Sequence, residues 1–204
     1  MTKPKAKPFL VLDFEFTHYK RAIGRPRGFF AEIIEIGAVK IDPVTYDEIG
    51  SIQNFVKPHF FPKQSVDTME FCSITEADMK TAITFKAMMD KLNDMYTPGE
   101  TYIVAWGGED FNVLKTGCKN HHITNPILQA DYVDLADAYR KLHNDSYTTS
   151  LTNTAKELGI EIKGHSHAAY DDAALTAKIL IKLMEHGYRP ANYPIGDLTR
   201  LPLT

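Results

Sequence analysis

FLVLDFEF, residues 9–16, is an apolar and aromatic-rich stretch that two carboxylates, Asp13 and Glu15, interrupt. Such a stretch is typical of a buried β-strand. The same features predict two more strands, AEIIEIGAVKI (31–41) and SIQNFVKP (51–58), with a turn in DPVTYDEIG (42–50) between them. Three successive strands with short connections favour antiparallel pairing.

The pattern changes to a helical period after these strands. SITEADMK (73–80) contains a capping-box pattern in Thr75 and Asp78, which predicts the start of a short helix. A second helix is predicted because apolar residues then recur at helical spacing, at Phe85, Met88, Met89, Leu92 and Tyr96.

Strands and helices alternate in the rest of the chain. We expect strands in TYIVAW (101–106) and YVDLA (132–136), and helices in EDFNVLKTGC (109–118), SLTNTAKELGI (150–160) and after GHSHAAYDD (164–172). Strands first and alternation afterwards predict an α/β fold, a mixed five-stranded sheet flanked by helices on both faces. We expect a single domain over 1–204, with a core at about 8–187 and a Pro-containing tail at 188–204.

Composition excludes several classes of protein. The 204 residues carry a net charge of −3, so bulk charge does not indicate a nucleic-acid partner. Cys72 and Cys118 lack metal-site spacing, and we expect two buried thiols without a disulfide partner. No apolar window approaches the roughly 18 residues of a membrane span, and MTKPKAKPF differs from a signal peptide. We therefore expect a cytoplasmic protein with no membrane partner.

Asp13 and Glu15 are separated by one residue, so a strand places both side chains on one face and Leu12 and Phe14 on the other. Two neighbouring carboxylates in an apolar strand repel each other and are costly to bury unless a cation neutralises them. A metal site and a solvated strand end are both compatible with this pattern.

Asp110 follows the strand 101–106 at the start of a helix. Loops at the ends of strands collect functional groups in α/β sheets, so this carboxylate could reach the same metal as Asp13. Glu109 competes with it one position earlier. Both could instead be acidic residues favoured at a helix N-terminus by the macrodipole.

Helix geometry separates Asp172 from Asp171. At about 100° per residue, Ile179 and Leu183 lie within roughly 20° of Asp172, which places Asp172 in the middle of the apolar stripe. Asp171 is rotated about 100° away, toward charged residues such as Lys178, and is expected to be solvated. We therefore predict that Asp172 faces the core and needs a partner there.

His167 lies five positions before Asp172, on a segment that can fold over a site. Histidine ordinarily titrates near neutral pH, which suits a base that takes a proton from water. His165 could serve equally, or both could be surface residues. A zinc site that combines these two with His121 and His122 lacks cysteine ligands and a known spacing.

Together, DFE (13–15), AWGGEDFNVL (105–114) and HAAYDDA (167–173) resemble the three motifs of the DEDDh family of 3′-to-5′ exonucleases, in the family's order. The resemblance spans about 8–187 and is strongest to the Eri-1-like and KapD-like branch. Many family members have H-N-x-x-F-D in the second motif, whereas this chain has WGGED (106–110). That departure leaves the choice between Glu109 and Asp110 slightly open.

The resemblance implies a ribonuclease H-like fold, a single-stranded nucleic-acid partner and two Mg²⁺ or Mn²⁺ ions, about 3.5 to 4 Å apart, in each active site. The implied ligands are Asp13, Glu15, Asp110 and Asp172. His167 would deprotonate the attacking water, and Glu15 would ligate a metal or orient the 3′-terminal sugar. The implied products are nucleoside 5′-monophosphates, with RNA favoured over DNA as the substrate.

Aromatic side chains near these motifs are candidates for stacking on terminal bases. They are Phe14, Phe16, Trp106 and Phe71, although more of them are expected in the core. The loop YKRAIGRPRG (19–28) carries Lys20, Arg21, Arg25 and Arg27, which could contact phosphates or could only be solvated. Two other functions remain: a regulatory or binding protein on the exonuclease fold, and a phosphodiesterase for short oligonucleotides. Oligomeric state is left undetermined.

Overall fold

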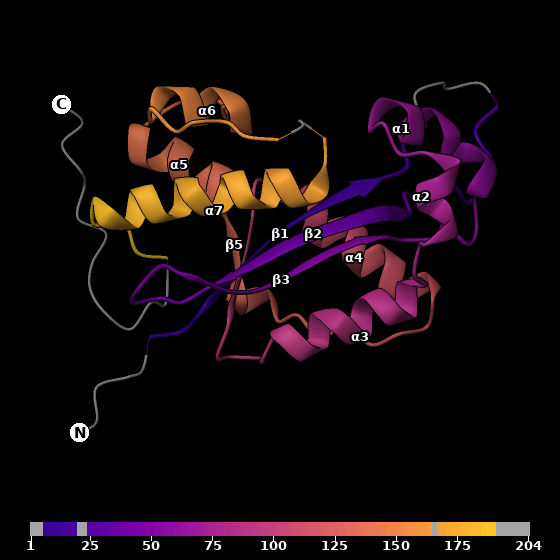
Figure 1. Cartoon of the computed structure of the whole chain (residues 1–204), viewed down its shortest axis with the longest axis horizontal. Coiled ribbons are helices and arrows are strands. Elements are labelled where there is room, and N and C mark those ends of the chain that lie inside the picture. Colours follow the sequence, from indigo (N-terminus) through magenta and orange to yellow (C-terminus); the bar gives the residue numbers. More distant parts are fainter. Residues whose placement is uncertain (1–5, 20–23, 165–166, 191–204) are drawn as a thin grey trace.

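A five-stranded mixed sheet in the order β3-β2-β1-β4-β5 forms the centre of the computed structural model, which describes residues 6–19, 24–164 and 167–190. Helices cover both faces of the sheet (Figure 1). The strands are β1 (Phe9–Phe16), β2 (Ile33–Ile41), β3 (Glu48–Phe55), β4 (Tyr102–Ala105) and β5 (Tyr132–Asp134). The helices are η1 (Pro62–Gln64), α1 (Val66–Phe71), α2 (Glu76–Lys80), α3 (Phe85–Met95), α4 (Glu109–Asn120), η2 (Gln129–Asp131), α5 (Leu135–His143), α6 (Leu151–Glu157) and α7 (Ala169–Glu185).

The pairing of the strands confirms the predicted topology. β1, β2 and β3 are antiparallel neighbours, whereas β4 runs parallel to β1 and β5 runs parallel to β4. The carboxyl ends of β1, β4 and β5 therefore lie at the same edge of the sheet. Side chains from three separate segments of the chain can meet there.

Alternation along β1 and β2 divides the core into two layers. One face of the sheet packs Leu10, Leu12, Ile36 and Ala38 against α3 and α4. The other face packs Phe9, Val11, Val39 and Ile41 against α5, α6 and α7. Asp13 and Glu15 continue the alternation of Phe9 and Val11, so they share one face, as predicted from their spacing, and that face is the one that α7 covers.

Several boundaries differ from the sequence prediction. β3 begins at Glu48, inside the predicted turn, because its pairing with Ile41 extends the antiparallel ladder. The capping box of Thr75 and Asp78 is present at the start of α2, as predicted. α1 was not predicted, because Thr68 is its only buried residue and it therefore has no apolar stripe.

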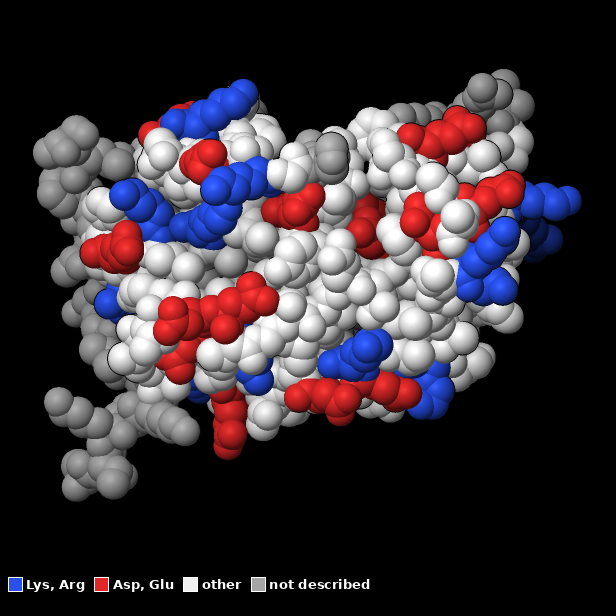
Figure 2. Space-filling view, in the orientation of Figure 1, with Lys and Arg blue, Asp and Glu red and all other residues white. Residues whose placement is uncertain are grey.

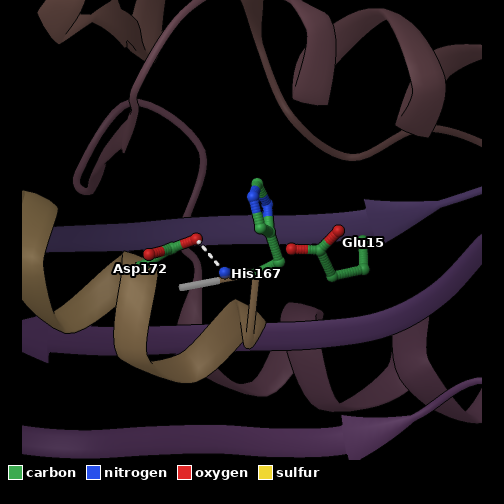
Figure 3. Close-up of side chains that lie close together, drawn as sticks. All are labelled: Glu15, His167 and Asp172. Carbon is green, nitrogen blue, oxygen red and sulfur yellow. Dashed lines mark hydrogen bonds between the residues drawn. The ribbon is translucent and has the colours of Figure 1, made fainter. Parts of the chain in front are cut away.

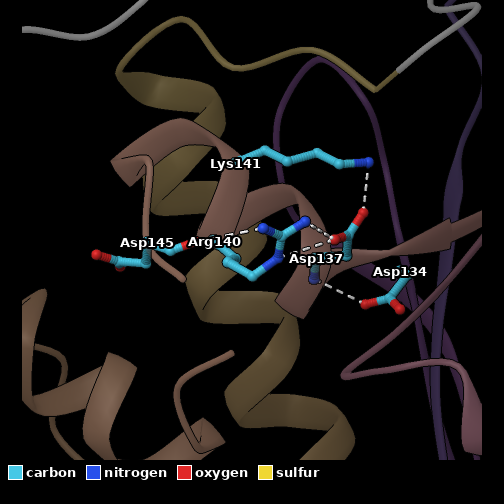
Figure 4. A network of polar contacts seen from close by, with 5 residues as sticks. All are labelled: Asp134, Asp137, Arg140, Lys141 and Asp145. Atoms are coloured by element: carbon cyan, nitrogen blue, oxygen red, sulfur yellow. Dashed lines mark hydrogen bonds and ion pairs between the residues drawn. The ribbon is translucent and has the colours of Figure 1, made fainter. Parts of the chain in front are cut away.

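The N-terminus of α5 is held at the carboxyl end of β5 (Figure 4). Asp134 Oδ1 accepts the backbone N–H of Asp137 at 2.9 Å, which caps the helix. Asp137 also forms ion pairs with Arg140 and Lys141. Such partly exposed pairs contribute little to stability. In the part of the chain that the structure describes, no helix is long and apolar enough to cross a membrane.

Candidate active site

The carboxyl end of β1 places Asp13 and Glu15 beside β2. Asp13 lies opposite Gly37 in the antiparallel ladder, and Glu15 lies opposite Glu35. Opposite residues share a face. The first turn of α7 covers this face, because a Cβ at Gly37 would meet the backbone of Ala169 and Tyr170. Acidic side chains gather where this end of α7 approaches the region of α1 and α2 (Figure 2).

Glu15, His167 and Asp172 converge at this point. Each offers one ligand atom, and these atoms lie within 4.8 Å of one another. The imidazole of His167 lies between the two carboxylates (Figure 3). The backbone N–H of His167 donates to Asp172 Oδ2 at 3.1 Å, and His167 has a positive φ of 66°. The chain therefore makes a sharp turn just before α7 that holds this side chain over the strand.

Asp110, and not Glu109, points toward β1. Asp110 is only 6 % exposed, and its Oδ1 accepts the backbone N–H of Phe14 at 2.9 Å. Glu109 is exposed at the start of α4. The hydrogen bond joins α4 to the residue between Asp13 and Glu15, so the geometry favours Asp110 as the third carboxylate.

Asp171 and Asp172 differ less in burial than the apolar stripe of α7 predicts. Ile179 and Leu183 are buried, and Asp172 lies on their side, next to His167. Asp171, however, is half-buried and not solvated as expected. Its carboxylate lies against Gly164, where an added Cβ would be 2.2 Å from Asp171 Oδ2. The preceding loop folds back over this side of the helix, which helical periodicity does not reveal.

Burial and mutual repulsion raise the pKa values of these carboxyl groups. Burial is the largest cause at each, and it raises the pKa of Asp110 to about 7. The pKa of Asp13 is raised well above its usual value by burial and by the charges of Asp110, Asp172 and Glu15. Burial also raises the pKa values of Glu15 and Asp172. These groups are therefore costly to ionise in the metal-free protein.

The donor set fits a hard divalent cation. Within residues 6–19, 24–164 and 167–190, no lysine or arginine forms an ion pair with these four carboxylates. Carboxylate oxygens are the ligands that Mg²⁺ and Mn²⁺ prefer, and a cation would offset their repulsion. Asp13, Glu15, Asp110 and Asp172 are the residues that could hold such ions.

The alternative zinc set is not assembled by the described residues. The ring of His121 stacks on Phe85 with centroids 4.3 Å apart, on the α3 side of the sheet, opposite to α7. His122 is exposed at the end of α4. His165 lies outside the described residues, so its comparison with His167 stays a prediction.

Glu35 is a part of the site that the sequence analysis did not single out. It is 4 % exposed, and its Oε2 accepts the backbone N–H of Ala169 at 3.3 Å. Burial, partly opposed by this hydrogen bond, raises the pKa of Glu35 to about 7. A signal was present in the sequence, because a glutamate inside the apolar run 31–41 is as costly to bury as Asp13 or Glu15.

Cys72 was predicted to be a buried thiol, and that prediction is wrong, because the residue is only half-buried and contacts the site. Its Sγ donates to Glu15 Oε2 at 3.1 Å. Burial and the neighbouring carboxylates raise the pKa of the thiol, so Cys72 acts as a neutral donor. Cys118 is buried as expected.

The four aromatic candidates have different environments. Phe14 is 3 % exposed in the α3 and α4 layer, so a base cannot stack on its ring, and only its backbone N–H faces the site. Phe16 is half-buried beside His18. Trp106 is half-buried and donates through Nε1 to the carbonyl of Thr149.

Phe71 is the most open of the four, at 57 % exposed, and its ring centroid lies 4.4 Å from that of His167. In the basic loop, Arg27 is exposed and Arg25 lies over the ring of Phe29. Lys20 and Arg21 lie outside the described residues. Among these candidates, the structure therefore leaves Phe71 as the ring best placed beside the site.

Comparison with known proteins adds family relationships to this geometry. The profile of the family described as Exonuclease (RNase_T) matches residues 10–180. The chain is 35 % identical over 199 residues to the probable 3′-5′ exonuclease KapD of Bacillus subtilis (strain 168), covering 94 % of this chain and 95 % of that protein. It is 25 % identical over 200 residues to human ERI1 exoribonuclease 2, covering 87 % of this chain but only 28 % of that protein.

Solved structures share the fold. The nuclease domain of 3′hExo, a DEDDh family member bound to rAMP, has a TM-score of 0.77 at 22 % identity, covering 91 % of this chain and 96 % of that one. The Mg²⁺- and Mn²⁺-bound form of S. pombe Pop2p has a TM-score of 0.63 at 19 % identity, covering 89 % and 84 %. The predicted ribonuclease H-like architecture is confirmed by these likenesses.

Proposed function

The chain belongs to the exonuclease family (RNase_T) as a DEDDh-type 3′-to-5′ exonuclease, and on that premise we propose how it acts: it hydrolyses single-stranded nucleic acid stepwise from a free 3′ end and releases nucleoside 5′-monophosphates. The observation that carries this proposal is the convergence of Glu15, His167 and Asp172 within 4.8 Å. Two oxygen donors and one imidazole at that spacing can hold a cation and accept a proton side by side.

We assign the metal-binding role to Asp13, Glu15, Asp110 and Asp172, which would hold two Mg²⁺ or Mn²⁺ ions. When bound, such ions lower the pKa of a water and neutralise charge on the phosphate and leaving oxygen. The fit rests on the four carboxyl groups gathered at one sheet edge, with which no described lysine or arginine forms an ion pair. Asp110 reaches this edge because its Oδ1 is held by the Phe14 N–H.

His167 is the proposed general base. Its side chain is exposed on the turn before α7, so water and a 3′-terminal phosphate can approach it. Its backbone is held by Asp172, which fixes where the imidazole stands relative to the carboxylates. The imidazole would take the proton of the attacking water and pass it to solvent after each cleavage. Glu15, which Cys72 holds in place, would ligate or orient the terminal sugar.

We propose single-stranded 3′ ends as the substrate, with RNA favoured over DNA. The exposed ring of Phe71 beside His167 offers a surface on which a terminal base can stack. The preference for RNA is supported by the exoribonuclease relatives, although the chain spans only 28 % of ERI1 exoribonuclease 2. A ribose 2′-hydroxyl is the group that distinguishes the two substrates at such a site.

A matched pair of 5′-labelled single strands, one RNA and one DNA of the same sequence, tests the proposal. With Mn²⁺ or Mg²⁺ the purified protein should shorten the RNA one nucleotide at a time, and the DNA more slowly. Equal rates would remove the sugar preference. Cleavage of dinucleotides alone would instead indicate a short-oligonucleotide phosphodiesterase. Metal binding without cleavage of any substrate would indicate a binding protein on the exonuclease fold.

A further inference from the structure

The buried carboxylate of Glu35 joins the two halves of the candidate active site. Glu35 lies on β2 directly opposite Glu15, and its Oε2 accepts the backbone N–H of Ala169 at 3.3 Å. Ala169 is the first residue of α7. An acceptor with negative charge at a helix N-terminus satisfies one of the free N–H groups there and interacts favourably with the helix dipole.

Gly37 brings the same helix end into contact with the same strand. A Cβ at Gly37 would lie 2.1 Å from both Ala169 C and Tyr170 N, so the backbone of α7 rests on β2 at the only place where a side chain is missing from that strand. Gly37 lies opposite Asp13 in the ladder. The start of α7 is thus located by the two β2 residues that face Asp13 and Glu15.

The positions of two candidate site residues depend on where α7 begins on β2. His167 precedes Ala169 by two positions and Asp172 follows it by three, so both move with the first turn of the helix. Since the rise of a helix is about 1.5 Å per residue, a shift of one residue would exceed the tolerance of a metal ligand. The hydrogen bond at Ala169 and the contact at Gly37 oppose such a shift.

We propose that Glu35 is a positioning residue, which fixes the first turn of α7 on β2 and so sets Asp172 and His167 at their working distance from Asp13 and Glu15. Its carboxylate acts on the backbone of Ala169 and does not itself ligate a metal; this assignment rests on the proposed metal-dependent function. The hydrogen bond from the Ala169 N–H occupies Glu35 Oε2, which is why we assign the carboxylate to the backbone of α7.

The discriminating substitutions are E35Q and E35A. Glutamine keeps an oxygen that can accept the Ala169 N–H, whereas alanine leaves that N–H without its acceptor. Binding of Mn²⁺ alone is measured by the loss of the electron paramagnetic resonance signal of the free ion, which needs no turnover. We expect about 10- to 100-fold weaker Mn²⁺ binding in E35A, the usual effect of removing a group that orients a ligand, and binding close to wild type in E35Q.

A glutamine amide is a poor substitute for a carboxylate that ligates a metal, but it is a good hydrogen-bond acceptor. Equal losses of Mn²⁺ affinity in E35Q and E35A would therefore overturn the proposal. Unchanged binding in E35A would overturn it as well. If wild-type protein binds no Mn²⁺, the proposed metal-dependent function fails, and the positioning role that rests on it fails with it; wild-type binding that E35A leaves unchanged would contradict the positioning role alone. A melting curve of each variant is the control that it is folded.

G37A and E32Q complete the test. G37A leaves Glu35 intact and displaces the start of α7, so it should weaken Mn²⁺ binding. This test remains available if E35A does not fold. A folded G37A protein with wild-type Mn²⁺ affinity would contradict the proposal. Glu32 is the matched control, since its buried carboxylate accepts the backbone N–H groups of His59, Phe60 and Phe61 and, among the described residues, none from α7. E32Q should lower the melting temperature and preserve Mn²⁺ binding.

Discussion

The backbone N–H of His167 donates to Asp172 Oδ2 at 3.1 Å, which links the candidate base to a candidate metal ligand within one turn of chain. The bond closes a tight loop in which His167 takes a left-handed φ of 66°. That conformation is unfavourable for most residues, so the surrounding contacts must hold it. The position of the imidazole is therefore a property of the turn as well as of its side chain.

Removal of the His167 imidazole should lower kcat by about 10² to 10⁴, the usual contribution of a general base. H167N is preferable to H167A because asparagine tolerates a positive φ better. Stepwise shortening of a 5′-labelled strand gives the rate. H186A is a matched control, since His186 is exposed at the opposite end of α7. Undiminished cleavage by H167N and H167A would refute the assignment of the base.

Asp110 and Glu109 should respond very differently to substitution. D110N removes a proposed metal ligand and should reduce kcat by about 100-fold or more, beyond the effect of residues that only orient ligands. E109Q changes an exposed side chain at a helix start and should keep activity near the wild-type level. Single-turnover rates of the two variants decide the case. A larger loss in E109Q would show that the third carboxylate has been misassigned.

The free energy of unfolding of the metal-free protein should fall as pH rises from the pKa of Asp110 in the unfolded chain to its higher pKa in the folded chain. The folded-state value is raised to about 7 from the ordinary 3.8, so the folded chain binds more protons between these values. Melting temperatures at about pH 5 and about pH 7.5 should show a smaller decrease in D110N, which cannot ionise there.

Added Mn²⁺ should raise the melting temperature more at the higher pH, because the metal binds the ionised carboxylates. Identical pH dependence in wild type and D110N, or a metal effect that is greater at low pH, would contradict this account of the carboxyl cluster.

Cys72 should contribute modestly through its hydrogen bond to Glu15. C72S keeps a donor and should be close to wild type, whereas C72A loses about 1 kcal/mol, which corresponds to about fivefold in kcat. Steady-state rates test the difference. C118A is the control, because Cys118 is buried in the other layer and its loss should lower stability and leave kcat unchanged. Equal rates for C72A and C72S would exclude this role.

The sequence predicted those features that local patterns encode. Apolar runs located all five strands, and the stripe through Ile179 and Leu183 oriented α7 and Asp172. Contacts between distant segments were not encoded in this way. Cys72 meets Glu15 across 57 positions, and Glu35 meets Ala169 across 134. No periodicity within one segment can predict which distant group such a side chain will reach.

α1 was missed for a related reason. Thr68, its only buried residue, accepts the backbone N–H of His18 from the end of β1, so tertiary contact and not an apolar stripe holds the helix. Phe14 was a candidate for base stacking, but its ring lies in the core on the face opposite to Asp13, as strand alternation predicts, and only its backbone N–H reaches Asp110.

The identity of the released nucleotide tests the central claim most directly. Wild-type protein and D172N are incubated with uniformly labelled single-stranded RNA and Mn²⁺, and the products are separated by chromatography against nucleoside 5′- and 3′-monophosphate standards. Attack of water with departure of the 3′ oxygen predicts nucleoside 5′-monophosphates from the wild type and almost none from D172N. Nucleoside 3′-monophosphates, internal fragments, or equal release by D172N would contradict it.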